Sequence, residues 1–261
     1  GVIGEKFPIS QVLKTITKPQ MTKEWMNSAR AIMTTDTFPK GVSVTSMIEG
    51  KRITITGISK GSGMIKPNMA TMLGFIFIDA DFGSEILNKL LKENISYSFN
   101  SISVDGEEST NDTVILASTR AIKFKKPIKN VNDKRIIDFK KKLKKVFMKL
   151  SELIVRDGEG ATKLIEINVL NARNEKDANT FGKSIANSPL VKTAIHGSDP
   201  NWGRIIMALG KTYININIKK LKVYFGKYLV IKNGTAHSKV DDKIISKYLS
   251  LIHISEPTRR G

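Results

Sequence analysis

The sequence predicts a layered α/β sandwich, and three observations lead to this architecture. Segments in which apolar and polar residues alternate, as in strands, are interleaved with segments whose apolar residues recur at helical spacing. The two kinds of segment do not alternate strictly as strand–helix–strand units, which argues against a doubly wound parallel sheet. The 261 residues, 40% of them hydrophobic, are also enough to form a substantial core.

The first half of the chain is expected to contribute most of the sheet. A short helix should begin with Thr22 as its N-cap and run to Ala31, with Trp25, Met26 and Ala29 on one face. Strands are expected at residues 42–48, 52–58, 72–78, 101–104 and 113–118. The connections between them are a hairpin turn at 49–51, a helix at 84–93 and a polar loop at 105–112.

A long amphipathic helix should dominate the second half. It is expected to run from Asp133 to about Val155, because apolar residues recur there at helical spacing: Ile136, Phe139, Leu143, Val146, Phe147 and Leu150. The lysines between them then occupy the opposite, solvated face. Further along we expect a glycine loop at 157–161, a strand at 164–170, a helix at 176–186, a turn-forming loop at 196–204 and strands at 213–218 and 221–231.

The two ends of the chain differ from the rest of the sequence. The chain begins GVIGE, without an initiator methionine or a signal-like apolar stretch. Residues 249–261 (LSLIHISEPTRRG) depart from the lysine-rich style of the preceding sequence and resemble a translated sequencing adapter. We therefore expect these residues to be a foreign tail that is not part of the fold.

The composition argues against several classes of protein. Without cysteine, the chain has no disulfide, thiolate metal site or cysteine nucleophile, which fits a cytoplasmic location. The apolar runs are far shorter than the ~18 residues that span a bilayer, so we expect no membrane partner. Outside the tail the histidines are His196 and His237, which lack metal-ligand spacing, so we expect no metal.

The formal net charge of +19 raises nucleic-acid binding as a candidate function. Much of the excess lies on the polar face of the long helix. Only 7% of the residues are aromatic, and no base-reading motif accompanies the lysines. We therefore expect no nucleic-acid partner; steeply salt-dependent binding to DNA would favour this alternative instead.

One generic catalytic motif is present in the first half of the chain. Residues 57–61 (GISKG) fit G-x-S-x-G, the nucleophile elbow of α/β-hydrolases, and Asp112 and His196 follow in the expected order. An elbow must turn directly into a helix, which the glycines and proline of residues 61–68 oppose. We interpret the motif as a glycine-rich loop that contains a serine.

Residues 60–75 (KGSGMIKPNMATMLGF) are the most informative segment. An irregular approach ends at Ala70-Thr71 and an apolar strand begins at once, so the pattern alone makes Thr71 an ordinary first residue of a strand. An acyl-transfer enzyme without cysteine and with few histidines, however, needs another base for its nucleophile. An N-terminal threonine supplies one, because its α-amine, with a pKa near ~7.7–8, can accept the hydroxyl proton. Cleavage between Ala70 and Thr71 would create that group.

Several blocks of sequence resemble the ornithine acetyltransferase (glutamate N-acetyltransferase) family, over nearly all of residues 1–247. The blocks are GVIGE at 1–5, TTDT and PK within 34–40, the segment 60–75, VDGEESTND at 104–112, DGEGATK at 157–163, IANSPLVKTA at 185–194 and DPNWGRI at 199–205. Glu107 departs from the pattern, since the family more often has aspartate there. So many blocks in the family's order make chance similarity implausible.

The resemblance implies a self-processing enzyme. Its precursor would cleave between Ala70 and Thr71 into α and β chains, which would assemble as an α2β2 heterotetramer. Thr71 would be the nucleophile, with its α-amine as the base, and the amide N–H of Gly1 would belong to the oxyanion hole. The substrate-binding residues implied by the same blocks are Thr34, Lys60, Thr71 and Glu159, with Lys60 and Glu159 holding charged groups of an amino acid.

The implied reaction transfers an acetyl group from N2-acetylornithine to glutamate through an acetyl-threonine intermediate, in arginine biosynthesis. No cofactor is implied, although acetyl-CoA serves some family members as an acetyl donor. The alternative is a self-processing N-terminal-nucleophile aminopeptidase or amidase, which releases its product to water. The blocks around Glu159 and Trp202 favour the transferase.

The family's fold is an N-terminal-nucleophile-like α/β/β/α sandwich followed by a C-terminal α/β domain. We therefore expect a catalytic core over residues 1–170, made of an α-chain remnant (1–70) and a β chain from residue 71, and a C-terminal domain over 171–248. Relative to the family, most of the α chain is missing, as is the C-terminal segment that supplies an asparagine and a Ser/Thr to the site. We expect the chain as given, incomplete at both ends, to be inactive by itself.

Overall fold

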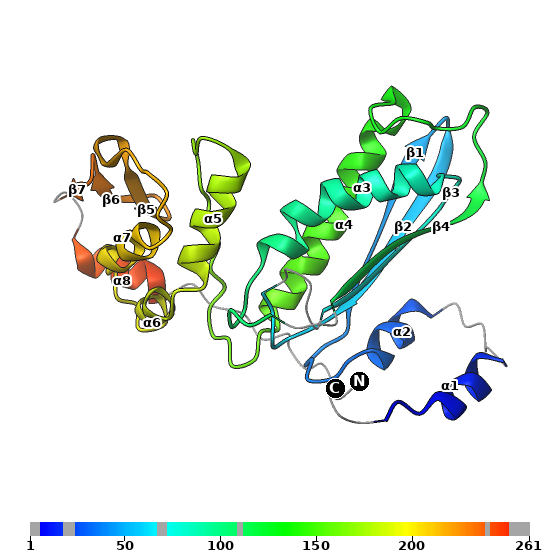
Figure 1. The fold of residues 1–261 in the computed structure, drawn as a ribbon, viewed down its shortest axis with the longest axis horizontal. Helices are drawn as coiled ribbons and strands as arrows, with labels where there is room; N and C mark the ends of the chain where they lie inside the picture. Colours follow the sequence, from blue (N-terminus) through cyan, green and yellow to red (C-terminus); the bar gives the residue numbers. More distant parts are fainter. Residues whose placement is uncertain (1–5, 18–23, 67–71, 109–111, 238–240, 251–261) are drawn as a thin grey trace.

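The computed structural model describes residues 6–17, 24–66, 72–108, 112–237 and 241–250. Its elements form two groups, each with its own hydrophobic core (Figure 1). The first group contains a four-stranded sheet and two long helices, and the second contains shorter helices around a three-stranded sheet. The predicted mixed α/β class is confirmed.

The four-stranded sheet has the order β1-β2-β3-β4. Its strands are β1 (Lys40–Ile48), β2 (Lys51–Lys60), β3 (Leu73–Ala80) and β4 (Thr113–Ile122). The pairs β1–β2 and β2–β3 are antiparallel, whereas β3–β4 is parallel. Lys60 pairs with Leu73, and Leu73 pairs with Thr113. The start of β1, the end of β2 and the starts of β3 and β4 therefore lie at one edge of the sheet, here called the site edge.

Two helices cover one face of this sheet (Figure 1). They are α3 (Ser84–Tyr97), which with the 3-10 turn Phe99–Ser101 connects β3 to β4, and α4 (Ile137–Arg156), which follows the 3-10 turn Lys134–Ile136. The apolar stripe predicted for α4 is fully buried against the strands. On the opposite face lies α2 (Trp25–Ala31), whose Trp25 ring packs on Phe77 at a centroid distance of 5.2 Å.

The second group follows the loop after α4. Its elements are α5 (Glu175–Ala186), α6 (Pro189–His196), α7 (Trp202–Gly210), the 3-10 turn Ile218–Lys220, β5 (Lys222–Phe225), β6 (Tyr228–Lys232), β7 (Thr235–Ala236) and α8 (Asp242–Ser250). The three strands form an antiparallel sheet in the order β5-β6-β7. Ile231, Ile245 and Leu249 are buried in its core, so the first residue of the expected tail, Leu249, lies inside α8.

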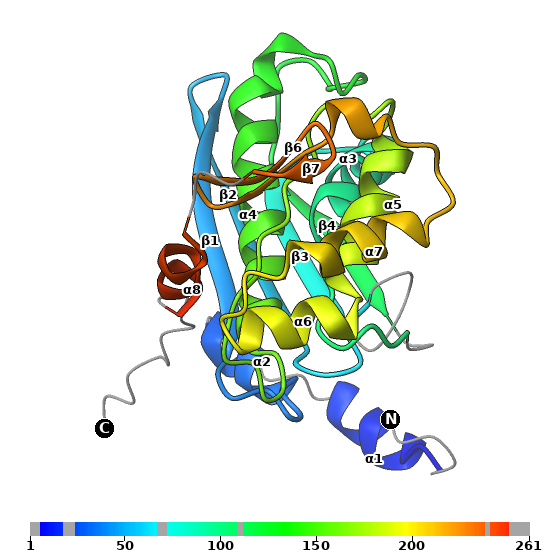
Figure 2. The ribbon, with the colours of Figure 1, turned by 90° about the vertical axis from the view of Figure 1, so that its left-hand side faces the viewer.

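Polar contacts join the two groups. Lys192 Nζ donates to the carbonyl oxygen of Val104 at 2.5 Å, and Lys163 Nζ, in the loop that connects the groups, donates to that of Ile195 at 2.7 Å. Tyr97 Oη donates to Glu175 at 2.9 Å. Figure 2 looks along the long axis and shows the second group in front of α4 and the sheet. Both views place α1 (Ile9–Ile16), which the sequence did not predict, apart from both groups (Figures 1 and 2).

Several local predictions are wrong. Residues 101–104, 164–170 and 213–218 form no strand, and 221–231 is the β5–β6 hairpin instead of one strand. An alternating pattern becomes a strand only where a neighbour can complete the ladder, and these three segments pair with no described strand. The N-cap of α2 is Glu24 and not Thr22, which lies outside the described residues.

Helices α6, α7 and α8 and strand β7 were also not predicted. The loop expected at 196–204 is instead the end of α6, a short turn and the start of α7. Ser188 caps α6 through its side chain and Pro189 occupies the first turn, which together are a helix start signal visible in the sequence. In the part of the chain that the structure describes, no helix is long and apolar enough to cross a membrane.

Candidate functional site

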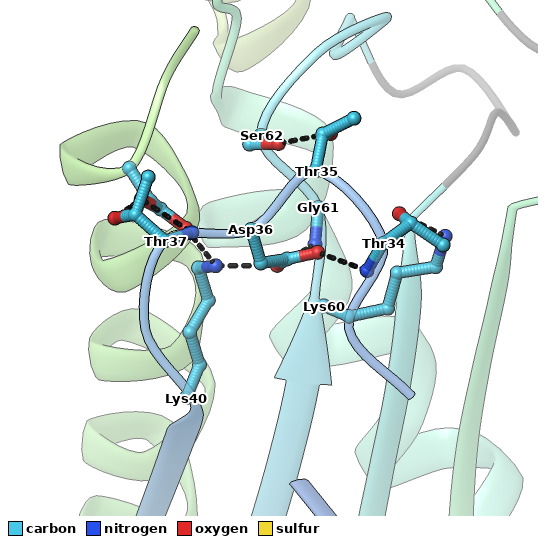
Figure 3. Close-up of polar contacts among 9 residues, drawn as sticks. Thr34, Thr35, Asp36, Thr37, Lys40, Lys60, Gly61 and Ser62 are labelled. Carbon is cyan, nitrogen blue, oxygen red and sulfur yellow. Dashed lines mark hydrogen bonds and ion pairs between the residues drawn. The ribbon is translucent and has the colours of Figure 1, made fainter. Parts of the chain in front are cut away.

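The polar side chains of greatest interest gather at the site edge. The loop from Thr34 to Thr37 leads into β1 and passes over the end of β2, where Lys60, Gly61 and Ser62 lie (Figure 3). The loop after α4, which carries Glu159, reaches the same edge, since the Glu159 N–H donates to the carbonyl oxygen of Ser62 at 2.9 Å. Three segments distant in sequence therefore meet at this edge.

A buried charge cluster holds these segments together. Lys40 Nζ lies 2.5 Å from Asp36 Oδ1 and 2.5 Å from Asp157 Oδ2, and all three side chains are almost completely inaccessible. Asp36 also accepts the Gly61 N–H at 2.7 Å. Asp157 accepts the Thr37 N–H at 3.0 Å. The Asp36–Lys40–Asp157 cluster thus fixes the first loop, the end of β2 and the end of α4 to one another.

The environment of Asp36 keeps its carboxylate ionised. Burial by itself would raise the pKa of Asp36, but the Gly61 N–H, the Lys40 ammonium and the Thr34 N–H stabilise the charged form more strongly. The net effect is a pKa below the usual value for aspartate. A buried anion beside a buried cation, each with further partners, is the arrangement in which charges are tolerated inside a protein.

Thr34 and Lys60 lie side by side above the end of β2. Lys60 Nζ is 3.5 Å from Thr34 Oγ1, and the Thr34 N–H donates to Asp36 at 3.2 Å (Figure 3). Gly61 then turns the chain with a φ of +145°, a conformation that residues with a Cβ rarely adopt. Beyond it, Ser62 Oγ is 2.6 Å from Thr35 Oγ1, a second tie between β2 and the first loop. Two of the predicted substrate-binding residues are therefore together.

Glu159 is the third predicted substrate-binding residue and follows Asp157 in the loop after α4. Its carboxylate lies against Gly63, where an added Cβ would be 2.7 Å from Glu159 Cδ. Among the described residues, neither the Glu159 carboxylate nor the Lys60 ammonium forms an ion pair. The site edge therefore combines a buried cluster, in which one ammonium group pairs with two carboxylates, with one cation and one anion that are available to a ligand.

The predicted nucleophile and its neighbours lie outside the described residues. These are Thr71 and Ala70 at the predicted cleavage point and Gly1 of the predicted oxyanion hole. Their assigned roles stay predictions. Met72 is the next described residue. Its carbonyl oxygen accepts the Thr113 N–H at 2.9 Å, and β3 begins beside Lys60.

The rejection of a nucleophile elbow is confirmed. Ser59, the serine of GISKG, lies inside β2, which continues to Lys60, and its side chain is buried. The described residues that follow the strand, 61–66, form no helix. The other two residues of the supposed triad form hydrogen bonds with other partners: Asp112 accepts the Met72 N–H, and His196 Nδ1 is 3.0 Å from Thr162 Oγ1.

Part of this site could not be predicted from the sequence. Lys40, Asp36 and Asp157 all lie in or beside blocks that carry the family resemblance, but nothing in the pattern separates a charge that binds substrate from one that is buried. The described residues contain no group of three or more His, Cys, Asp or Glu side chains that could hold a metal ion.

Comparison with known proteins places this site in a family context. The model of the ArgJ family matches residues 1–255. The "Arginine biosynthesis bifunctional protein ArgJ" of Bartonella quintana is 42% identical over 259 residues, which are 98% of this chain and 63% of that protein. The protein of the same name from Caldanaerobacter subterraneus is 46% identical over 242 residues, or 90% of this chain and 60% of that protein.

A solved structure is also similar. The crystal structure of the arginine biosynthesis bifunctional protein argJ from Bacillus halodurans superimposes with a TM-score of 0.65 at 35% sequence identity. The match covers 69% of this chain and 84% of that chain. The chain spans about 63% of the length of the Bartonella relative.

Proposed function

The chain belongs to the ArgJ family, and from this membership we propose that the protein transfers an acetyl group from N2-acetylornithine to glutamate. The names of the relatives state a bifunctional role in arginine biosynthesis. The observation that carries the proposal is a pair of charges at the site edge that form no ion pair with the described residues: Lys60 beside Thr34, and Glu159 against Gly63. N2-acetylornithine carries a carboxylate and a side-chain ammonium group, so a site for it needs one cation and one anion.

Thr71 is the proposed nucleophile, and its free α-amine is the proposed base. The Thr71 hydroxyl oxygen attacks the acetyl carbonyl of N2-acetylornithine while the α-amine accepts the hydroxyl proton. The C–N bond then breaks, the proton passes to the leaving nitrogen, and ornithine departs from an acetyl-threonine ester. The amino group of glutamate attacks this ester, the Thr71 oxygen leaves and recovers its proton, and N-acetylglutamate is released.

The α-amine requires that the chain first be cut between Ala70 and Thr71. Cleavage yields an α chain that ends at Ala70 and a β chain that begins at Thr71, and we propose that the two associate as an α2β2 heterotetramer in the cytoplasm. The Gly1 N–H is the proposed oxyanion donor. One donor of this kind is typically worth ~2.7–4 kcal/mol of transition-state stabilisation. No cofactor is needed, and acetyl-CoA is the second acetyl donor to assay.

Mass spectrometry and kinetics of the full-length protein test the proposal together. We expect two chains with a break before Thr71, together with transfer of labelled acetyl from N2-acetylornithine to glutamate. Thr71→Ala should give a single uncut chain without transferase activity, because both the nucleophile and the base are lost.

Thr45→Ala is the matched control, since Thr45 lies on the exposed side of β1. This variant should be cut and active like the unmodified protein. If the Thr71→Ala chain still divides at the same bond, the nucleophile assignment is wrong. Release of free acetate that does not depend on glutamate would instead favour the aminopeptidase or amidase alternative.

A further inference from the structure

The Glu159 carboxylate lies in a space, here called the seat, that is open because Gly63 has no side chain. A Cβ built on Gly63 would lie 2.7 Å from Glu159 Cδ, 2.8 Å from Oε2 and 2.9 Å from Oε1. Non-bonded atoms in folded proteins do not approach a Cβ this closely. Any residue other than glycine at position 63 would therefore have to displace the whole carboxylate group. The contact is therefore one that only glycine permits.

The backbones on both sides of this contact are anchored. The Glu159 N–H donates to the Ser62 carbonyl at 2.9 Å, and Ser62 Oγ lies 2.6 Å from Thr35 Oγ1. One residue earlier, the Gly61 N–H donates to buried Asp36 at 2.7 Å. The loop that carries Gly63 is thus fixed to the backbone that carries Glu159. The carboxylate itself makes no hydrogen bond or ion pair with the described residues, so its position depends on the shape of the seat.

We propose that Gly63 is a positioning residue for Glu159. By leaving room for the carboxylate, Gly63 sets where this anion stands relative to Lys60 and so how the site receives the ammonium group of an amino-acid substrate. The inference rests on the substrate-binding role that the proposed function gives to Glu159.

The backbone at this position does not itself require glycine. Gly61 has a φ of +145°, but Gly63 is not among the residues with positive φ. Alanine at position 63 therefore changes the space beside Cα and not the conformation of the loop. Because the atoms it would meet are the end of a flexible side chain, rotation of Glu159 relieves the overlap. Gly63→Ala should fold normally and misplace one carboxylate.

A double-mutant cycle in the full-length protein tests the inference. The variants are Gly63→Ala, Glu159→Ala and the two combined, with KM and kcat measured for N2-acetylornithine and glutamate. We expect Gly63→Ala to lower kcat/KM on the order of 10- to 100-fold, mainly through KM, since a misplacement of about 1 Å can have an effect of this size. The double variant should match Glu159→Ala, because no carboxylate remains for the added methyl group to displace.

Gly41→Ala is the matched control. Gly41 lies beside Lys40 at the same edge, and a Cβ there would meet its nearest atoms at an ordinary 3.9 Å. This variant should retain its kinetics and its folding. If Gly63→Ala lowers kcat/KM by the same factor with and without Glu159, the residue acts through something other than the carboxylate and the inference is overturned.

A crystal structure of the Gly63→Ala variant separates this inference from the proposed function. Displacement of the Glu159 carboxylate, with the loop unmoved, supports the seat. A carboxylate that stays in place while the loop shifts overturns it. Should Glu159→Ala leave the kinetics unchanged, the substrate role in the proposed function fails, and the crystal structure alone then decides whether Gly63 positions the carboxylate.

Discussion

Charged side chains at the site edge have two different roles: some hold the loops in place, and others are available to a ligand. Asp36, Lys40 and Asp157 are buried and satisfy one another, so they hold the loops in place and have no capacity left for a ligand. Lys60 and Glu159 lie at the ends of the same loops without ion pairs among the described residues. A rigid buried cluster beside two available charges is the arrangement expected of a preorganised binding site, because the ligand need not order the loops.

Removal of Lys40 should therefore destabilise the fold strongly. Lys40→Met keeps the aliphatic bulk but leaves Asp36 and Asp157 buried as neighbouring anions. We expect the free energy of unfolding to fall by about 3–5 kcal/mol, the usual result of breaking a buried pair from one side. Urea denaturation followed by circular dichroism measures this change.

Lys89→Met provides the comparison for that experiment. Lys89 also pairs with a carboxylate, Glu85, at 2.8 Å, but both side chains are more than half exposed. An exposed pair at this helical spacing contributes roughly 0.3–0.5 kcal/mol. Similar losses in the two variants would mean that Lys40 does not neutralise a buried cluster.

The low pKa of Asp36 predicts a component of acid unfolding. A carboxyl group whose pKa is lower in the folded than in the unfolded state stabilises the fold above its unfolded value, near ~3.9, and loses this contribution as the pH falls through the folded value. Asp36→Asn should lower stability at neutral pH and flatten its dependence on pH below about 4.

Salt distinguishes Asp36 from surface groups that titrate in the same range. The pKa of Asp81 is also lowered, by Arg120 and Lys123, but those partners are more than half exposed. At about 1 M salt the Debye length is near 3 Å, so surface contributions are screened and the contribution of Asp36 persists. An Asp36→Asn variant with the unmodified pH dependence in high salt would contradict this account.

Among the structural elements, α4 contributes most to the core that supports the site. It presents Val146, Phe147 and Leu150 to the sheet, and each is fully buried. The fit is close, since a Cβ on Gly57 of β2 would lie 2.7 Å from Leu150 Cδ1. The last turn of α4 leads directly to Asp157 and Glu159, so the packing of this helix determines where both carboxylates lie.

Truncation within this contact should be costly. Leu150→Ala removes a fully buried side chain beside Gly57, and we expect a loss of about 2–5 kcal/mol in the free energy of unfolding. Met148→Ala, two residues earlier on the exposed face of α4, should change stability by no more than about 0.5 kcal/mol. Equal effects in chemical denaturation would show that α4 does not pack as described.

The comparison of elements also shows which features a sequence can reveal. The helix α4 and the strand β3 were predicted because their apolar patterns are long and unambiguous. Residues 164–170 alternate as well as many strands do, yet they form none, because a strand requires a partner and alternation does not identify one.

The residues of the site also divide into those that the sequence reveals and those that only the structure reveals. Thr34, Lys60 and Glu159 could be selected from the sequence blocks, and the structure brings their segments together. The contact between Lys40 and Asp157, which are 117 positions apart, follows from packing and not from any local pattern. The role of Gly63 was hidden for the same reason, since it depends on a carboxylate from another loop.

Taken together, the two groups of elements have separate hydrophobic cores and polar contacts between them. An interface of this kind couples neighbouring units weakly, so each should respond mainly to changes in its own core. The chain contains two tryptophans, and each group holds one. Trp25 packs on Phe77 of the four-stranded sheet, and Trp202 packs against the second core. Fluorescence can therefore report on each group separately.

Single-tryptophan variants test whether the groups unfold independently. Trp202→Phe leaves Trp25 as the reporter of the first group, and Trp25→Phe leaves Trp202 as the reporter of the second. Ile231→Ala, which empties a fully buried position in the second core, is then added to each. We expect the Trp202 transition in urea to move by the equivalent of about 2–5 kcal/mol while the Trp25 transition stays in place. An equal shift of both reporters would show that the polar contacts make one cooperative unit, in which case the second core also stabilises the site edge.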